Sequence, residues 1–210
     1  MMEGAFAQSC RMRRYFTVVI IVFTVLFILT NMVLWSAEAP AKPKLLKINK
    51  ELDKRTAIKK SQIPGAGNGL FALVKIKKGE VIGELGGLLL EKFPEGNHYV
   101  GALLECAQEK AKPYKYLDSK EHGANVSRIN FAPSKINGVD THFQNAGIKR
   151  LCEPPYFEFV ALEDIVPGAE ILSSYGPNYD YERFMRIPEV RDFFCGMAKT
   201  KCMEKYSYDY

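Results

Sequence analysis

The hydrophobic and polar positions change their pattern twice along the chain. Residues 16–35 form a run of 20 residues without a charged side chain, residues 36–55 are rich in lysine, and from Thr56 onward short apolar runs are separated by polar breaks. A helix needs about 20 apolar residues to cross the hydrocarbon core of a membrane. The pattern therefore predicts a short head over residues 1–15, a transmembrane signal anchor over 16–35, a basic linker over 36–55 and a folded domain after it.

Two alternatives to the anchor are open. Ala37-Glu38-Ala39 resembles the cleavage site of a signal peptide. The apolar run is longer, however, than the apolar region of such a peptide, which is typically about 7–15 residues. The second alternative is a buried core helix, which would normally show a polar face that this run lacks.

The charges beside the apolar run predict its orientation. Three arginines precede the run, and six lysines and arginines follow it within about 20 residues, where such charges count. The excess favours a single-pass membrane protein with a cytoplasmic C-terminal domain, in which the glycosylation sequon Asn125-Val126-Ser127 would stay unmodified. The linker is either a solvated spacer or a segment attracted to anionic lipid headgroups.

The remainder of the chain has the pattern of a mainly β domain. The predicted strands are residues 69–76, 80–91, 156–165 and 169–176. Lys77-Lys78-Gly79 and Pro167-Gly168 are turn signals between neighbouring strands. The predicted helices are residues 98–111 and 180–194, and Pro188 interrupts the second. Because strands and helices do not alternate, a doubly wound nucleotide-binding fold is not expected.

Charge and cysteine content narrow the classes of function. The net charge of +5 is small, and no basic stripe is interleaved with aromatic residues, so direct binding of nucleic acid is not expected. The five cysteines are an odd number at irregular spacings, which does not indicate a disulfide framework. The spacing of Cys195 and Cys202 does not favour a zinc site, so no metal is expected.

A glycine-rich segment opens the folded domain. Three glycines, Gly65, Gly67 and Gly69, occupy alternate positions before an apolar stretch. Glycine adopts positive φ and carries no Cβ, so a bulky ligand can lie against the main chain there. The segment is either a tight turn before a strand or the wall of a site for a nucleotide-like ligand.

Four motifs in this order resemble the SET domain of protein lysine methyltransferases. Gly67-Asn68-Gly69 corresponds to the family's G-x-G turn, and Lys78-Gly79-Glu80 corresponds to its basic-Gly-Glu turn. Arg128–Ala132 corresponds to an Arg-Phe-Ile-Asn-His-Ser segment, and Tyr175 corresponds to the tyrosine that ends the last strand.

The resemblance implies a fold and a chemistry. The fold would be SET-like, with short strands in small sheets, a pseudoknot and a few short helices over residues 56–176, before an aromatic and helical extension over 177–210. The chemistry would be the transfer of methyl groups from S-adenosyl-L-methionine to a lysine side chain of a protein or peptide substrate.

The resemblance also assigns roles to individual residues. Tyr175 is the candidate catalytic residue, because its hydroxyl would orient the lysine amine, and Tyr116 is a candidate for the substrate channel. The candidate cofactor-binding residues are Gly67, Asn68, Gly69, Asn130, Phe131 and Tyr175.

The chain departs from the family pattern at several places, among them a long stretch, Ala132–Gln144, between Asn130 and Asn145. Phe131-Ala132 stands where the family has His-Ser, which removes the hydrogen bond of a histidine side chain. Ser173-Ser174 precedes Tyr175, where tyrosine and aspartate are common in the family. The alternative function is therefore a catalytically silent SET-like binding or scaffold module anchored to a membrane.

Overall fold

The computed structural model describes residues 22–27, 40–136, 139–175, 182–199 and 208–209. The chain divides after Pro40 into two compact units. In the first unit, residues 22–27 are helical and exposed. Among the described residues, no helix is both long and apolar enough to cross a membrane. Most of the run 16–35, on which the predicted anchor depends, lies outside the described residues.

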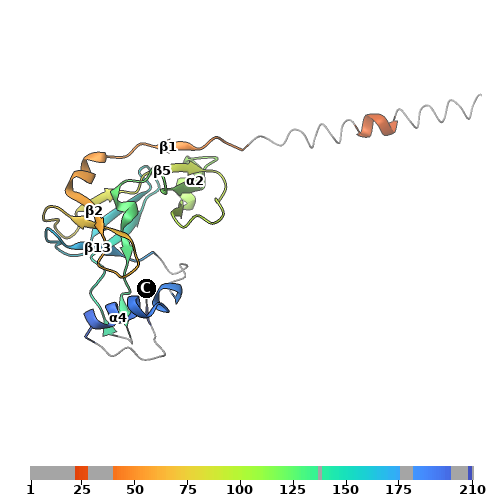
Figure 1. The fold of residues 1–210 in the computed structure, drawn as a ribbon. Coiled ribbons are helices and arrows are strands. Elements are labelled where there is room, and N and C mark those ends of the chain that lie inside the picture. Colours follow the sequence, from red (N-terminus) through yellow and green to blue (C-terminus); the bar gives the residue numbers. More distant parts are fainter. Residues whose placement is uncertain (1–21, 28–39, 137–138, 176–181, 200–207, 210) are drawn as a thin grey trace, which may run out of the picture. The chain divides into compact units, whose positions relative to one another are not determined.

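The second unit is mainly β, as predicted (Figure 1). Its largest sheet is built from β2 (Thr56–Lys60), β3 (Asn68–Ala72), β4 (Val81–Glu84), β8 (Asn130–Phe131), β11 (Ala146–Arg150), β12 (Phe157–Ala161) and β13 (Glu170–Ser173). These strands follow the order β2-β3-β13-β11-β12-β4, and β8 also pairs with β13.

Two smaller sheets complete the β-structure. One contains β1 (Lys44–Leu46), β5 (Gly87–Leu90), β6 (Val100–Ala102) and β7 (Tyr116–Asp118), in the order β1-β5-β7-β6. The other contains β9 (Lys135–Ile136), β10 (Val139–Asp140) and β14 (Tyr208–Asp209), with β9 in the middle. The short helices are η1 (Lys50–Arg55), α2 (Glu105–Lys110), η2 (Asn125–Arg128), α3 (Glu182–Met185) and α4 (Pro188–Met197).

Strand β13 joins segments that lie far apart in the sequence. It pairs antiparallel with β3, and parallel with β8 and β11. Leu172 lies opposite Asn130, and Ser173 lies opposite Phe131. All four residues of β13 are buried. The pairing brings Asn130 beside the strand that precedes Tyr175, a juxtaposition that the resemblance attributes to a pseudoknot.

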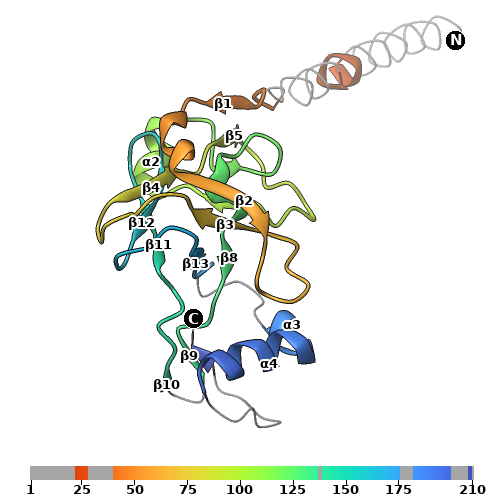
Figure 2. The same cartoon turned by 60° about the vertical axis from the view of Figure 1, so that its left-hand side comes forward.

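Three hydrophobic clusters hold the unit together. The first fills the large sheet around Leu70, Ile82 and Ile171, and the second lies under β1, β5, β7 and α2. The third packs the C-terminal helices against β8 and β9 around Phe194, which is fully buried. Figure 2 shows α3 and α4 at the end of this unit opposite β1 and β5.

Two predicted boundaries are wrong. Residues 44–55, predicted as part of a linker, contain β1 and η1. β1 forms because it pairs with β5 and buries Leu46. η1 forms because the side chain of Asn49 caps it by accepting a hydrogen bond from the amide of Glu51 at 3.1 Å. The predicted helix over 98–111 is helical only in its second half, since its first half pairs as β6 with β7. In contrast, Pro188 begins α4, which confirms the predicted interruption.

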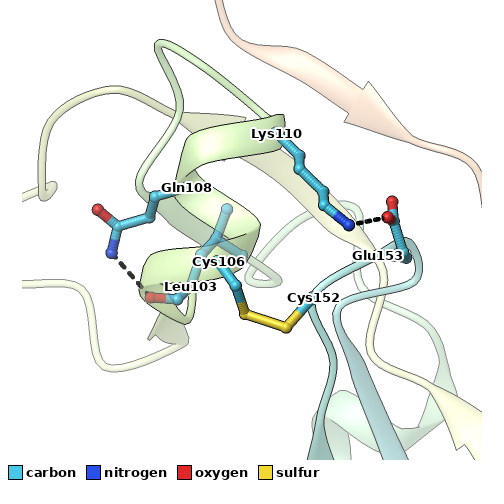
Figure 3. The surroundings of a disulfide bond; sticks show 6 residues. All are labelled: Leu103, Cys106, Gln108, Lys110, Cys152 and Glu153. Atoms are coloured by element: carbon cyan, nitrogen blue, oxygen red, sulfur yellow. Dashed lines mark hydrogen bonds and ion pairs between the residues drawn. A yellow bond between two sulfur atoms is a disulfide. The ribbon is translucent and has the colours of Figure 1, made fainter.

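Some of the cysteines form disulfide bonds, although their odd number and irregular spacing do not indicate the disulfide framework of a secreted protein. Cys106 of α2 is bonded to Cys152, which precedes β12, across a sequence separation of 46 (Figure 3). An ion pair between Lys110 and Glu153 lies beside the bond. Cys195 of α4 is disulfide-bonded as well. Spacing along the chain did not reveal the Cys106–Cys152 bond, because packing of α2 with Tyr156 and Phe157 in one hydrophobic cluster brings the two segments together.

Removing the Cys106–Cys152 bond should destabilise the domain. Closing a loop of this length restricts the unfolded chain by about 4 kcal/mol in the chain-entropy account of disulfides. We expect the double variant Cys106→Ser/Cys152→Ser to lower the free energy of unfolding by about 2–4 kcal/mol, measured by urea denaturation.

Lys110→Ala is the matched control, because it breaks the neighbouring ion pair of the same helix and leaves the disulfide intact. Both partners of that pair are more than half exposed, so the change should cost less than about 1 kcal/mol. Equal stability of the double serine variant and the wild type would refute a stabilising role for the bond.

Candidate active site

Two adjoining cavities lie where the glycine-rich segment, β8 and the C-terminal helices approach one another. The larger has a volume of about 500 Å³ and the smaller about 190 Å³. The larger volume lies in the range of small-molecule sites, roughly 300–1,000 Å³. The residues that line both cavities are Ala66, Tyr99, Ser127, Ile129, Asn130 and Tyr175. The two spaces therefore meet around Asn130 and Tyr175.

The glycine-rich segment is both a tight connection and a wall of the larger cavity. It joins β2 to β3, and the amide of Ser61 donates to the carbonyl oxygen of Gly67 at 2.9 Å. Gly65 and Gly67 have φ values of +73° and +72°, which disfavour residues with a Cβ. Residues 63–66 line the larger cavity. The segment is thus a tight turn before a strand, and the ligand-site interpretation stays a prediction.

Gly69 is required because neighbouring side chains leave no room for a Cβ at this position. It lies buried in β3 with an ordinary backbone conformation. A Cβ at this position would overlap Oε1 of Glu170 and lie 3.0 Å from Nδ2 of Asn130. The missing side chain leaves room for a polar contact between β13 and β8.

The amide of Asn130 is held in one orientation. Its Nδ2 donates to the carbonyl oxygen of Asn68 at 3.1 Å and to Oε1 of Glu170 at 3.2 Å. Both partners are acceptors only, so Nδ2 rather than Oδ1 must face them. Within the described part of the chain, no donor bonds Oδ1 of Asn130. This oxygen is the atom that remains to accept a hydrogen bond from a ligand.

The Tyr175 hydroxyl is fixed next to this amide. It donates to the carbonyl oxygen of Ile129 at 2.7 Å. Tyr175 is half-buried and lines both cavities. The hydroxyl proton is therefore directed at Ile129 and not into either cavity.

Phe131 serves as a packing residue for the C-terminal helices. Its ring is 5% exposed, and its centroid lies 5.5 Å from that of Phe184, 5.8 Å from that of Phe194 and 6.1 Å from that of Tyr175. Such spacings are typical of aromatic pairs in hydrophobic cores. Phe131 also lines the larger cavity. The departure from the family's histidine therefore provides an apolar contact for α3 and α4.

The structure brings together some of the predicted site residues and not others. Asn130, Phe131 and Tyr175 line the larger cavity, and Asn68 lines the smaller one. Gly67 and Gly69 line neither cavity and act through backbone conformation and space.

Tyr116, the predicted channel residue, also lines neither cavity. Its ring packs edge-on against Phe93 at 5.5 Å. Tyr99 lines both cavities instead, and the guanidinium of Arg128 lies 5.3 Å from the centre of its ring. Sequence reasoning missed Tyr99 because nothing local to it indicates that the turn before β6 faces β8.

Sequence reasoning also missed Glu170. A signal was present, because Glu170 directly precedes the apolar pair Ile171-Leu172 of a strand, and glutamate is rarely buried unless it is paired. Its partners are distant in the sequence, so the sequence could not identify them.

Comparison with known proteins agrees with this arrangement. A family model described as the SET domain matches residues 67–176. Among curated proteins, none matches the chain.

Several solved structures are similar to this chain. The polycomb repressive complex 2 of Chaetomium thermophilum shares 25% identity at a TM-score of 0.46, over 60% of this chain and 16% of that one. The methyltransferase domain of human PR domain-containing protein 2 shares 16% identity at a TM-score of 0.45, over 70% of this chain and 98% of that one. ATXR5, in complex with histone H3.1 mono-methylated on R26, shares 18% identity at a TM-score of 0.46, over 60% of each chain. This chain therefore spans only a small part of the polycomb chain that it matches.

Adding a methyl group at Gly69 should disturb the contact between Glu170 and Asn130. We expect Gly69→Ala to lower the free energy of unfolding by about 1–3 kcal/mol, as overpacking of a buried site does. Gly196→Ala is the control, because nothing lies within 4 Å of a Cβ there and the residue is helical. Its stability should be unchanged or up to about 1 kcal/mol higher. Equal effects of the two substitutions in denaturant titrations would show that space at Gly69 is not limiting.

Proposed function

Because the chain belongs to the SET-domain family, we propose that it is a protein lysine methyltransferase that uses S-adenosyl-L-methionine. The observation that carries the proposal is the position of the Tyr175 hydroxyl. It is fixed 2.7 Å from the carbonyl oxygen of Ile129, beside Asn130, where the two cavities meet. One cavity would take the cofactor and the other the substrate lysine.

The residues around the larger cavity suit this cofactor. Oδ1 of Asn130 is an acceptor without a donor among the described residues, and it suits a ligand ammonium group. Within the loop, Gly65 and Ala66 offer main chain and little side chain, against which a flat nucleoside can lie. S-adenosyl-L-methionine, when bound, would supply an electrophilic methyl group on a sulfonium.

The chain's own residues would then position the amine. The carbonyl oxygen of Ile129 holds the Tyr175 hydroxyl in one orientation. In this orientation the hydroxyl oxygen would orient an amine and contact a methyl group. Arg128 lines the smaller cavity, and its positive charge together with the loss of water would favour the neutral form of a lysine there, because both lower the pKa of an amine. Tyr99 offers an aromatic wall for the aliphatic stem and the cationic product. We assign Tyr99 rather than Tyr116 to the substrate channel.

We also propose that residues 16–35 anchor the chain in a membrane. Support comes from the run of 20 uncharged residues and from the aromatic residues Tyr15 and Trp35 at its two ends.

Replacing the Tyr175 hydroxyl tests the proposed chemistry. Tyr175→Phe removes the oxygen and keeps the ring, so we expect the rate of methyl transfer to fall by about 10- to 1,000-fold, or about 1.4–4 kcal/mol in barrier. The affinity for S-adenosyl-L-methionine should change by less than about threefold, because the contact counts mainly in the transition state. Peptide arrays with labelled cofactor measure the rate, and calorimetry measures the affinity.

Tyr116→Phe is the matched control and should retain full activity, since Tyr116 lies outside both cavities. Absence of any heat of binding for the wild type at about 1 mM cofactor would overturn the proposal. Cofactor binding without transfer to any peptide would instead support the silent binding module, which the replacement of histidine by Phe131 favours.

A further inference from the structure

Glu170 is a buried charged residue in the central strand of the large sheet. Its side chain is 7% exposed. Oε1 accepts hydrogen bonds from Oγ of Ser61 at 2.7 Å and from Nδ2 of Asn130 at 3.2 Å, and Oε2 accepts one from the backbone amide of Gln62 at 2.8 Å. One carboxylate therefore ties the start of the glycine-rich loop to β8.

Ser61 continues this connection into the loop. Its Oγ accepts from the amide of Ile63 at 3.0 Å while it donates to Glu170. Its backbone amide donates to Gly67. The loop that lines the larger cavity is thus held at its base by bonds that converge on one carboxylate.

We propose that Glu170 is a positioning residue for the ligand of the larger cavity. By accepting from Nδ2 of Asn130, it fixes the amide so that Oδ1 accepts a hydrogen bond from the ammonium group of the ligand's amino-acid part. By accepting from Gln62, it holds the loop against the nucleoside part. The proposal rests on the proposed function for the identity of the ligand, and on the geometry of the free protein for the role of Glu170.

A glutamine cannot replace this carboxylate. The carboxylate presents two acceptor oxygens to three donors. A neutral amide has one acceptor oxygen, and its NH₂ group would face at least one donor. Leaving a buried donor unpaired costs more than the net value of an ordinary hydrogen bond. Glu170→Gln should therefore release either Asn130 or the loop at Gln62.

A double-mutant cycle on ligand affinity tests the role of Glu170. We expect Glu170→Gln to weaken the binding of S-adenosylhomocysteine by about 10- to 100-fold. Methylthioadenosine lacks the amino-acid part, so its affinity should fall by a smaller factor, about three- to tenfold, through the loop alone. In the Asn130→Ala background, Glu170→Gln should weaken S-adenosylhomocysteine only by this smaller factor, because the contact to Asn130 is already lost. Additive losses, or equal losses for the two ligands, would show a general structural effect and overturn the proposal.

Hydrogen exchange of the ligand-free protein tests the same residue without a cofactor. Exchange across residues 61–69 should be about tenfold faster in Glu170→Gln than in the wild type. Glu158→Gln is the matched control, since Glu158 lies on β12 between the inward residues Phe157 and Phe159 and bonds none of the loop. If the wild type binds neither S-adenosylhomocysteine nor methylthioadenosine, the proposed cofactor is wrong. Unchanged hydrogen exchange in Glu170→Gln would separately overturn the role of Glu170 in holding the loop.

A second, independent inference comes from the disulfide between Cys106 and Cys152. Cys106 is exposed and Cys152 is half-buried, so soluble reductants can reach the bond (Figure 3). Thiols of this kind stay reduced in the cytosol, whereas disulfides persist in oxidising compartments. The bond therefore argues against the cytoplasmic side that the flanking charges favour. That charge argument depends on a small excess of six residues over three.

The glycosylation state of the natural sequon at Asn125 does not show on which side of a membrane the domain lies. Nδ2 of Asn125, the atom that would carry a glycan, donates to the carbonyl oxygen of Asp53 at 3.2 Å and to Oγ1 of Thr56 at 3.3 Å. A glycan at this nitrogen would replace one of its two hydrogens, so at least one of these bonds would be lost. An unmodified Asn125 is thus expected on either side of a membrane.

We infer that the folded domain resides on the non-cytoplasmic side, where the Cys106–Cys152 bond can form. An exposed sequon tests this inference. Lys75→Asn with Lys77→Thr creates one in a turn whose two altered side chains are exposed, and Lys75→Asn alone lacks the threonine and serves as the control. In a eukaryotic host, the double variant should acquire a glycan that a glycosidase removes, and the control should not.

Thiol alkylation in intact cells provides the second measurement. A maleimide should label Cys152 in Cys106→Ser and should not label either residue in the wild type before reduction. A double variant without a glycan, together with ready alkylation of both cysteines in the wild type, would place the domain in the cytosol and overturn the inference. That outcome would leave the proposed methyl transfer unaffected.

Discussion

The burial of β13 is the constraint on which the rest of this domain depends. A strand with all four residues buried has no water to satisfy its backbone groups, so both of its edges need partners. β3 supplies one edge, and β8 and β11 supply the other. Asn145 completes the pairing, because its side chain donates to the carbonyl oxygen of Glu170 at 2.9 Å and accepts from the amide of Leu172 at 2.9 Å.

The same strand sets the geometry of the candidate active site. Glu170 begins β13 and binds the base of the glycine-rich loop, while Tyr175 follows the end of the strand and reaches Ile129. Asn130 lies opposite Leu172, between these two contacts. A strand paired along its length is rigid, so the loop, the amide and the hydroxyl are held at defined separations. This rigidity is what a reaction based mainly on alignment requires.

Aromatic packing explains how the C-terminal extension is attached. Phe194 is fully buried and lies 5.8 Å from Phe131, 5.8 Å from Phe143 and 5.3 Å from Phe193, measured between ring centroids. The helices therefore bury their apolar face against β8. Phe131, which replaces the family's histidine, is at the centre of this contact and links the extension to the cavity wall.

The sequence by itself determined the mainly β character of the domain and its turns at glycine and proline, and it singled out Asn130 and Tyr175, which line both cavities. Those features are local, because alternation, positive φ and short motifs are encoded within a few residues. Only the tertiary structure decided that Cys106 meets Cys152, that β1 belongs to the domain, and that Tyr99 rather than Tyr116 lines the cavities. It also decided that Gly69 makes space for Glu170. Each of these depends on contacts between segments far apart in the chain, which strand pairing brings together and which no local pattern specifies.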